Sequence, residues 1–346
     1  MKQKKVIIVT IIALLGLFSL FMLSSCDSIS LGTTGHVDGS TSGNSSGTNG
    51  GSSNSQQPSQ TEGTSNNPTV AQPTVNVPDI LVPTAPGIDI EENGQAIVDF
   101  SNKQDGYIMA KYLEETDMTV KILISVPDGE EPYQYTLRPN REFEVFPLSG
   151  GNGVYEIGVY KQVEGTRYSL LLSLTIDVTL VDEFAPFLRP NQVVNFNQNS
   201  NAVRKAAELV AGKSSFMDIV GAIYHFVIEN IVYDVHLAET VQIGYIPDVD
   251  MVLASGKGIC YDYAALMTAM LRSQGIPTRL VVGYTGDVYH AWISVYSKED
   301  GWLDDVIFFD GSAWRLLDPT FAAGGSAAAV AQYIGDGTNY VVRFLH

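Results

Sequence analysis

The chain has 346 residues, of which 45% are hydrophobic, so it is long enough for two folded domains with apolar cores. Lys and Arg together number 20 against 38 Asp and Glu, which gives a formal net charge of −18 at pH 7. This acidic balance, with no basic stripe interleaved with aromatic residues, excludes nucleic acid as an expected partner.

Residues 1–26 have the pattern of a targeting segment. Lysines at the start of the chain precede an apolar stretch over 6–22, and Leu-Ser-Ser-Cys then ends at Cys26. This segment resembles a bacterial lipoprotein signal peptide, which implies cleavage before Cys26 and lipidation of that cysteine. An uncleaved membrane anchor is the alternative, although the stretch is near the lower length limit for spanning a bilayer. Both interpretations predict an extracytoplasmic protein attached to the membrane.

Residues 27–87 consist mainly of Ser, Gly, Thr, Asn, Gln and Pro, with almost no apolar clusters. Such a segment buries too little apolar surface to offset the entropy lost on ordering. We therefore predict a disordered tether that lets the folded part of the chain reach away from the membrane.

Residues 88–181 contain short alternating runs rich in β-branched and aromatic residues, separated by turn residues such as Asp128-Gly129. The predicted strands are Ala96–Phe100, Gly106–Tyr112, Met118–Ser125, Tyr133–Leu137, Glu142–Phe146, Gly153–Tyr160 and Tyr168–Thr179. This spacing predicts an antiparallel, sandwich-like domain. Because no cysteine pair or catalytic cluster occurs here, we interpret the domain as a spacer or a binding module.

Residues 182–346 form the second predicted domain, in which helical periodicity appears. The predicted helices are Ala202–Ala211, Phe216–Val232 and Cys260–Gln274. The segment 234–255 is polar and mixed, and is predicted to be a loop over the site. The predicted strands are Arg279–Tyr284, Val288–Tyr296, Val306–Asp310, Ala313–Leu317 and Asn339–Phe344.

Cys260 is the only cysteine after Cys26, and it begins a predicted helix directly after Gly256-Lys257-Gly258. The unpaired N–H groups and the dipole at a helix start favour a thiolate, which is the nucleophilic form of the side chain. A small buried hydrophobe is the other interpretation, because Cys260 shares one helix face with apolar residues. Asp262 lies about 200° further around the helix, so its carboxylate is expected to serve the helix end.

His290 and Asp318 follow on later strand-like segments. Period-two alternation places Tyr289 and Ala291 on one face of the predicted strand, and His290 and Trp292 on the other. A thiol, an imidazole and an orienting carboxylate are the groups that covalent acyl transfer requires. Taken separately, His290 would more commonly be a structural histidine, and the preferred interpretation of Asp318 would be a turn residue before a proline.

Several motifs agree in order and spacing with a known family. They are Gly258–Ala264, Met270–Arg272, Gly275–Arg279, Gly283-Tyr284, His290–Trp292 and Leu317–Thr320. Together they resemble the bacterial transglutaminase-like superfamily, which implies a papain-like cysteine fold. The resemblance also implies Cys260 as nucleophile, His290 as base and Asp318 as orienting acid. Cys260 N–H is a candidate oxyanion donor, and Tyr233 and Trp292 are weaker candidates for a second donor.

The predicted fold class is therefore α+β, with a transglutaminase-like C-terminal domain preceded by an all-β sandwich-like domain. The expected activity is hydrolysis or transamidation of protein or peptide amides, cell-wall peptides included. A surface-binding module without activity and a peptidoglycan peptide hydrolase are the alternatives. Asp304, Asp305 and Asp310 lack the spacing of a calcium loop, and no nucleotide fingerprint or zinc pattern occurs, so no cofactor or metal is predicted.

Overall fold

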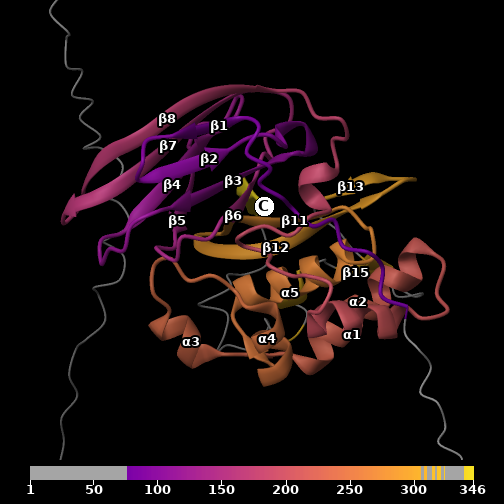
Figure 1. The fold of residues 1–346 in the computed structure, drawn as a ribbon. Helices are drawn as coiled ribbons and strands as arrows, with labels where there is room; N and C mark the ends of the chain where they lie inside the picture. The colour runs from indigo at the N-terminus through magenta and orange to yellow at the C-terminus, as the bar shows by residue number, and fades with distance from the viewer. Residues whose placement is uncertain (1–75, 305–307, 310–313, 316–317, 321–322, 324–338) are drawn as a thin grey trace, which may run out of the picture. The chain divides into compact units, whose positions relative to one another are not determined.

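The structure is a computed structural model that describes residues 76–304, 308–309, 314–315, 318–320, 323 and 339–346 (Figure 1). The predicted signal peptide, Cys26 and most of the predicted tether lie outside the described residues and stay predictions. Within the described part of the chain, no helix is long and apolar enough to cross a membrane.

The region from 90 to 178 forms two four-stranded antiparallel sheets. The first has the order β1-β2-β3-β6, with β1 (Ile90–Glu92), β2 (Ala96–Asp99), β3 (Tyr107–Tyr112) and β6 (Glu144–Pro147). The second has the order β5-β4-β7-β8, with β5 (Tyr133–Leu137), β4 (Val120–Ser125), β7 (Gly153–Glu164) and β8 (Arg167–Val178). The strands predicted from the sequence are confirmed, with small differences at their ends.

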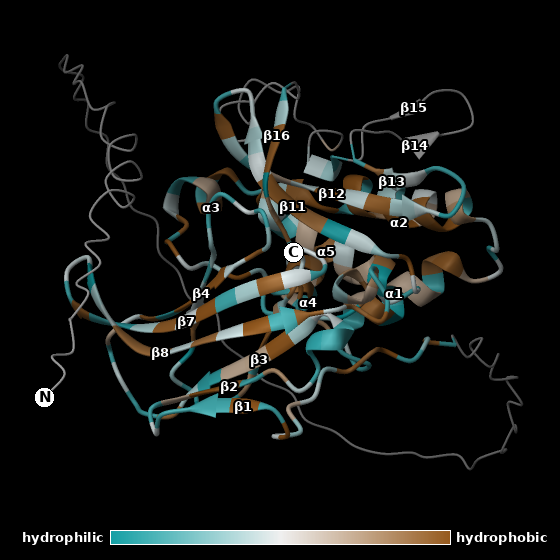
Figure 2. Cartoon of the chain, turned by 90° about the horizontal axis from the view of Figure 1, so that it is seen from above, coloured by the Kyte–Doolittle hydropathy of each residue, from teal (hydrophilic) through white to brown (hydrophobic). Residues whose placement is uncertain are grey.

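Alternation of apolar and polar residues explains the burial of these strands. In β4, Val120, Ile122 and Ile124 are buried, while the residues between them are partly exposed. The unpredicted β1 is exposed along its length and hydrophilic at its two glutamates (Figure 2). Charged residues on an edge strand discourage pairing with other chains.

The C-terminal part combines helices with a third sheet. The helices are α1 (Asn201–Val210), α2 (Phe216–Asn230), α3 (Val235–Thr240), α4 (Val249–Ser255) and α5 (Cys260–Arg272). The sheet has the order β13-β12-β11-β16, with β13 (Gly301–Leu303), β12 (Val288–Ser297), β11 (Thr278–Thr285) and β16 (Tyr340–Leu345). There are two further short strand pairs: parallel β9 (Val232–Tyr233) with β10 (Lys257–Gly258), and antiparallel β14 (Phe308–Phe309) with β15 (Trp314–Arg315). Two 3-10 helices, η1 (Lys103–Asp105) and η2 (Ala185–Phe187), are also described.

The prediction of a loop over 234–255 was wrong, because this segment contains α3 and α4. Each helix begins at an aspartate whose carboxylate accepts main-chain N–H groups: Asp234 from Leu237, and Asp248 from Asp250 and Met251. Helices this short contain too few turns for a hydrophobic period, so only their N-caps mark them in the sequence.

Helix α5 packs against β11 and β12 and contacts α1, α2 and α4. Buried apolar residues of these elements and of strands β2 to β8 belong to one connected core. The core therefore includes residues on both sides of the predicted domain boundary at 181–182, and that boundary stays a prediction.

The buried Arg272 fixes the C-terminal end of α5. Its Nε donates to Thr278 O at 2.9 Å, Nη1 to Arg189 O at 2.8 Å, and Nη2 to His346 O at 2.6 Å. Burial lowers the pKa of Arg272 to about 9. These hydrogen bonds reach three separate segments of the chain, and the bond to Thr278 holds α5 against β11.

Gly283 on β11 is required by close packing. A Cβ at this position would lie 2.0 Å from Val341 O and 3.0 Å from the Trp292 ring. We expect Gly283→Ala to lower the free energy of unfolding by about 3 kcal/mol or more, measured by urea denaturation. The control is Gly212→Ala, where φ is +76° but nothing lies near the new Cβ, and backbone strain alone should cost about 1–2 kcal/mol. Equal losses in both variants would contradict the packing explanation.

Candidate active site

Cys260 is the first residue of α5, and its side chain is partly accessible. The chain approaches it through Gly256, which has a φ of +64°, and Gly258, where a Cβ would lie 2.5 Å from the Asp262 Cβ. Gly256 therefore supplies a left-handed backbone conformation, and Gly258 lets the main chain lie close to Asp262. The thiol lies where the first-turn N–H groups have no partner within the helix.

Asp262 stabilises this helix start. Its Oδ2 accepts a hydrogen bond from Ile259 N at 2.8 Å, and its Oδ1 accepts one from the Tyr245 hydroxyl at 2.7 Å. Burial raises the pKa of Asp262, while the hydrogen bonds from Tyr245 and Ile259 oppose that rise. The prediction that Asp262 serves the helix end is confirmed.

His290 lies on β12 with a side chain that is fully buried, and Asp318 is 1% exposed. His290 Nε2–H donates to Asp318 Oδ2 at 2.7 Å, across a separation of 28 residues. The Tyr340 hydroxyl donates to the same oxygen at 2.8 Å. The carboxylate therefore fixes the imidazole orientation, and a tyrosine in turn fixes the carboxylate.

The negative charges around His290 favour its protonated form. Burial alone would lower the pKa of His290, but the charges of Asp318 and Cys260 and side-chain hydrogen bonding to both groups raise it to about 10. Because Nε2 is bonded to Asp318, Nδ1 is the nitrogen available to the thiol. Nδ1 is buried and has no partner with regular hydrogen-bond geometry in the described structure. Cys260 still influences the ring, since its charge is among the causes that raise the pKa of His290.

The predicted alternation along β12 is confirmed for His290 and Trp292. His290 is 1% and Trp292 4% exposed, and their rings stack with centroids 6.2 Å apart, as expected for side chains on one face. Ala291 is also buried, but Tyr289 is 45% exposed. Tyr289 therefore differs in exposure from Ala291, the other residue that the alternation assigns to its face.

The two weaker candidates for an oxyanion donor lie on different elements, β9 and β12. Tyr233 is on β9 and pairs with Gly258, two residues before Cys260. Trp292 stacks on the imidazole, and its ring also contacts Tyr340 with centroids 4.9 Å apart. Tyr340 was missed as a site residue, since no local sequence signal connects it to Asp318, 22 residues away.

Of the three aspartates considered as metal ligands, only Asp304 lies within the described residues. Asp304 accepts a hydrogen bond from Ser294 Oγ at 2.6 Å and lies 3.5 Å from Arg279 Nη1. Asp305 and Asp310 lie outside the described residues. No group of three or more His, Cys, Asp or Glu side chains suited to a metal ion occurs among the residues that the structure describes.

The raised pKa of His290 makes stability depend on pH. The folded protein binds this proton more tightly than the unfolded chain, so the contribution is complete below pH 6.5 and is lost as pH rises toward about 10. We expect the stability difference between wild type and His290→Gln to shrink in this window by up to about 1.4 kcal/mol per pH unit. Urea denaturation across pH 6 to 10 measures it.

His346 provides a control of opposite sign. Burial and the nearby charge of Arg272 lower the pKa of His346 to about 3. Its neutral form stabilises the fold above pH 6.5, and that contribution is lost as pH falls toward 3. His346→Gln should therefore change the free energy of unfolding only below pH 6.5. If His346→Gln and His290→Gln changed it over the same pH range, the opposite signs of the two pKa shifts would be contradicted.

Comparison with known proteins relates this geometry to a family. Residues 203–304 match the Transglutaminase-like superfamily, a range that contains Cys260 and His290 and ends before Asp318. A protein-glutamine gamma-glutamyltransferase of Pseudomonas aeruginosa is 34% identical over 68 residues, which are 16% of this chain and 10% of the relative. The uncharacterized protein YebA of Bacillus subtilis is 36% identical over 74 residues, again 16% and 10%. The chain thus spans about a tenth of the length of these curated relatives.

Two solved structures give weaker similarity. A candidate cysteine protease from Cytophaga hutchinsonii is 17% identical with a TM-score of 0.33, covering 69% of this chain and 91% of that one. Red sea bream transglutaminase is 14% identical with a TM-score of 0.26, covering 68% and 49%. Scores this low carry no argument about function. The family match over 203–304, with a helix-borne Cys260 and a strand-borne His290 inside it, identifies a domain of the transglutaminase-like superfamily in this chain.

Proposed function

We propose that this protein is an extracytoplasmic, membrane-anchored cysteine acyl-transfer enzyme that acts on protein or peptide amides. The observation that carries the proposal is the order of three groups. The partly accessible Cys260 thiol begins a helix, and its charge is among the causes that raise the pKa of His290. The Nε2 atom of His290 lies 2.7 Å from Asp318 Oδ2. This is the arrangement expected of an activated nucleophile with an oriented base.

The proposed reaction has two steps. The Cys260 thiolate attacks the amide carbonyl carbon, the C–N bond breaks, and protonated His290 gives its proton to the departing amine. Water or a second amine, deprotonated by His290, then attacks the thioester and restores the thiolate. The Cys260 N–H at the helix start is placed to donate to the developing oxyanion. Hydrolysis and transamidation differ only in which nucleophile reaches the thioester.

Substrate and location rest on the sequence and on relatives. Residues 1–26 support a lipid anchor at Cys26, and 27–87 support a tether of Ser, Gly and Pro. One curated relative is named as a protein-glutamine gamma-glutamyltransferase. The glutamine side-chain amide is therefore the first acyl donor to test, and peptide amides of the cell wall are the second.

The direct test is product analysis by mass spectrometry. The full-length protein is incubated with a glutamine-containing protein and a primary amine, and separately with purified wall peptides. Amine incorporation or amide hydrolysis with multiple turnovers supports the proposal and distinguishes its two forms. Absence of both, together with alkylation of Cys260 no faster than that of a free thiol, would leave a surface-binding module and overturn it.

A further inference from the structure

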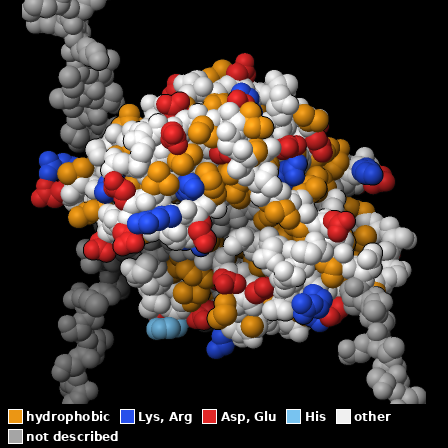
Figure 3. Space-filling model, in the orientation of Figure 1, with side chains coloured by type: hydrophobic (Ala, Val, Ile, Leu, Met, Phe, Trp, Pro, Cys, Tyr) orange, Lys and Arg blue, Asp and Glu red, His pale blue; other side chains and the backbone are white. Residues whose placement is uncertain are grey.

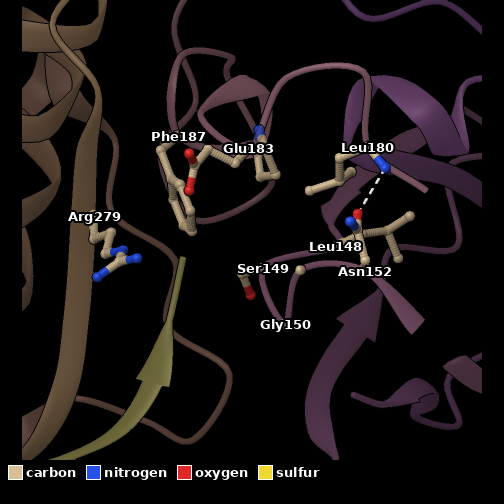
Figure 4. Close-up of a pocket in the computed structure, with 10 residues that line it drawn as sticks. Leu148, Ser149, Gly150, Asn152, Leu180, Glu183, Phe187 and Arg279 are labelled. Carbon is tan, nitrogen blue, oxygen red and sulfur yellow. Dashed lines mark hydrogen bonds between the residues drawn. The ribbon is translucent and has the colours of Figure 1, made fainter. Parts of the chain in front are cut away.

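A pocket of about 300 Å³ lies outside the Cys260 site, between the turn that joins β6 to β7, the segment 180–187 and Arg279 of β11 (Figure 4). Arg279 is four residues before Gly283, which pairs with His290. At about 3.3 Å per residue, the pocket is about 13 Å along the strand from the imidazole. No residue of the proposed catalytic group lines it.

Two buried donors at this pocket lack partners in the described structure. They are Ser149 Oγ, on a residue that is 9% exposed, and Arg279 Nε. A buried polar atom without a hydrogen bond costs about 1–3 kcal/mol, so native proteins rarely leave one unexplained. Two such donors lining one pocket indicate an acceptor that the chain itself does not supply.

Arg279 is held in place before any ligand binds. Its guanidinium lies 3.6 Å from the centre of the Trp302 ring and 5.0 Å from that of Phe187, and Nη1 is 3.5 Å from Asp304. Figure 4 shows the side chain extending from β11 toward Phe187 and Ser149. A preset guanidinium loses little conformational entropy on binding and is suited to a carboxylate.

Ser149 is fixed by the structure of its turn. The Tyr155 hydroxyl is placed to donate to Leu148 O at 3.1 Å and to Gly151 O at 2.8 Å. The Asn152 side chain accepts a hydrogen bond from Leu180 N at 2.8 Å, shown as the dashed line in Figure 4. Hydrogen bonds between the Tyr155 and Asn152 side chains and main-chain groups therefore hold both walls of the pocket, and the Ser149 hydroxyl takes no part in them.

The charges at the pocket restrict the ligand. The positive Arg279 is balanced by Asp304, and the exposed Glu183 adds a further negative charge at the pocket wall. A simple anion would be repelled by Glu183, whereas a ligand with an ammonium next to its carboxylate matches both signs. Leu148, Leu180 and Phe187 add apolar walls.

We propose that this pocket binds an apolar α-amino acid group in its zwitterionic form. The carboxylate accepts hydrogen bonds from Arg279 Nε and Ser149 Oγ, the ammonium faces Glu183, and the side chain lies against Leu148 and Leu180. A free amino acid and the zwitterionic end of a larger molecule both present this group. The pocket volume of about 300 Å³ accommodates an amino acid from either source. The proposal does not depend on the acyl-transfer function.

Isothermal titration of the full-length protein tests this site without an activity measurement. Leucine should bind saturably, while N-acetylleucine, which lacks the ammonium, and leucinamide, which lacks the carboxylate, should each bind at least about tenfold more weakly. A leucine-bearing zwitterionic compound with a long side-chain extension separates the two ligand sources. If the compound binds better than leucine, a larger molecule is the natural ligand; if it is excluded, the free amino acid is.

Ser149→Ala should weaken leucine binding by about 5–10-fold, because it removes one hydrogen bond of ordinary strength. The control is Ser173→Ala, the same change at an exposed position on β8, which should bind leucine as wild type does. Absence of saturable leucine binding would overturn the proposal. So would equal binding of all three compounds, or unchanged affinity in Ser149→Ala.

Discussion

Replacing Cys260 by alanine is expected to lower amide turnover by about 10³-fold or more, because no other side chain at the helix start can form the thioester. The free energy of unfolding should change by only about 1 kcal/mol, since a single partly buried sulfur is lost. Product formation by mass spectrometry and urea denaturation measure the two effects. Loss of activity without loss of stability separates a nucleophile from a packing residue.

Thr268→Val is the matched control on the same helix. Thr268 is buried, and its Oγ1 has no hydrogen-bond partner in the part of the chain that the structure describes. Replacing an unpaired buried hydroxyl by a methyl group should leave stability unchanged or raise it, with turnover unaffected. Full turnover in Cys260→Ala, or an equal loss in Thr268→Val, would contradict a specific role for the thiol.

Asp318→Asn is expected to lower kcat/KM by about 10²–10⁴-fold while the fold is retained. The amide can still contact His290, but the negative charge that raises the pKa of His290 is gone. The imidazolium should then lose its proton at lower pH, and the thiolate form of Cys260 should lose its paired cation. The pH dependence of Cys260 alkylation by iodoacetamide, followed by intact-protein mass spectrometry, measures this shift.

Asp304→Asn makes the same chemical change at another aspartate near this sheet. Asp304 is bonded to Ser294 Oγ and lies 3.5 Å from Arg279, whereas the charges that raise the pKa of His290 are those of Asp318 and Cys260. Its alkylation profile should match that of wild type. An unchanged profile in Asp318→Asn would show that the carboxylate acts only as a turn residue before Pro319.

Charged and apolar side chains are mixed on one face of the protein (Figure 3). On the face shown in Figure 3, Lys and Arg side chains lie singly among acidic and apolar ones, and among its described residues they form no continuous basic stripe. Apolar side chains are scattered over the same face. This face therefore offers no broad basic surface for the long-range attraction of an acidic ligand.

Local rules predicted most regular elements. The period of two in β4 and the helical run of α2 appear directly in the residue order, because backbone geometry fixes which side chains share a face. The same rules failed for α3 and α4, which are six and seven residues long. For helices this short, a capping aspartate is the only local signal, and aspartate is equally common in turns.

The sequence by itself determined that Cys260 starts a helix directly after Gly256-Lys257-Gly258 and that a motif resembling the transglutaminase-like superfamily surrounds it. Only the tertiary structure decided that His290 Nε2 contacts Asp318, that Tyr340 holds the same carboxylate, and that Ser149 and Arg279 line one pocket. The reason is physical. Backbone periodicity sets the direction of each side chain within its own element, whereas contacts between distant elements depend on how the shared core packs.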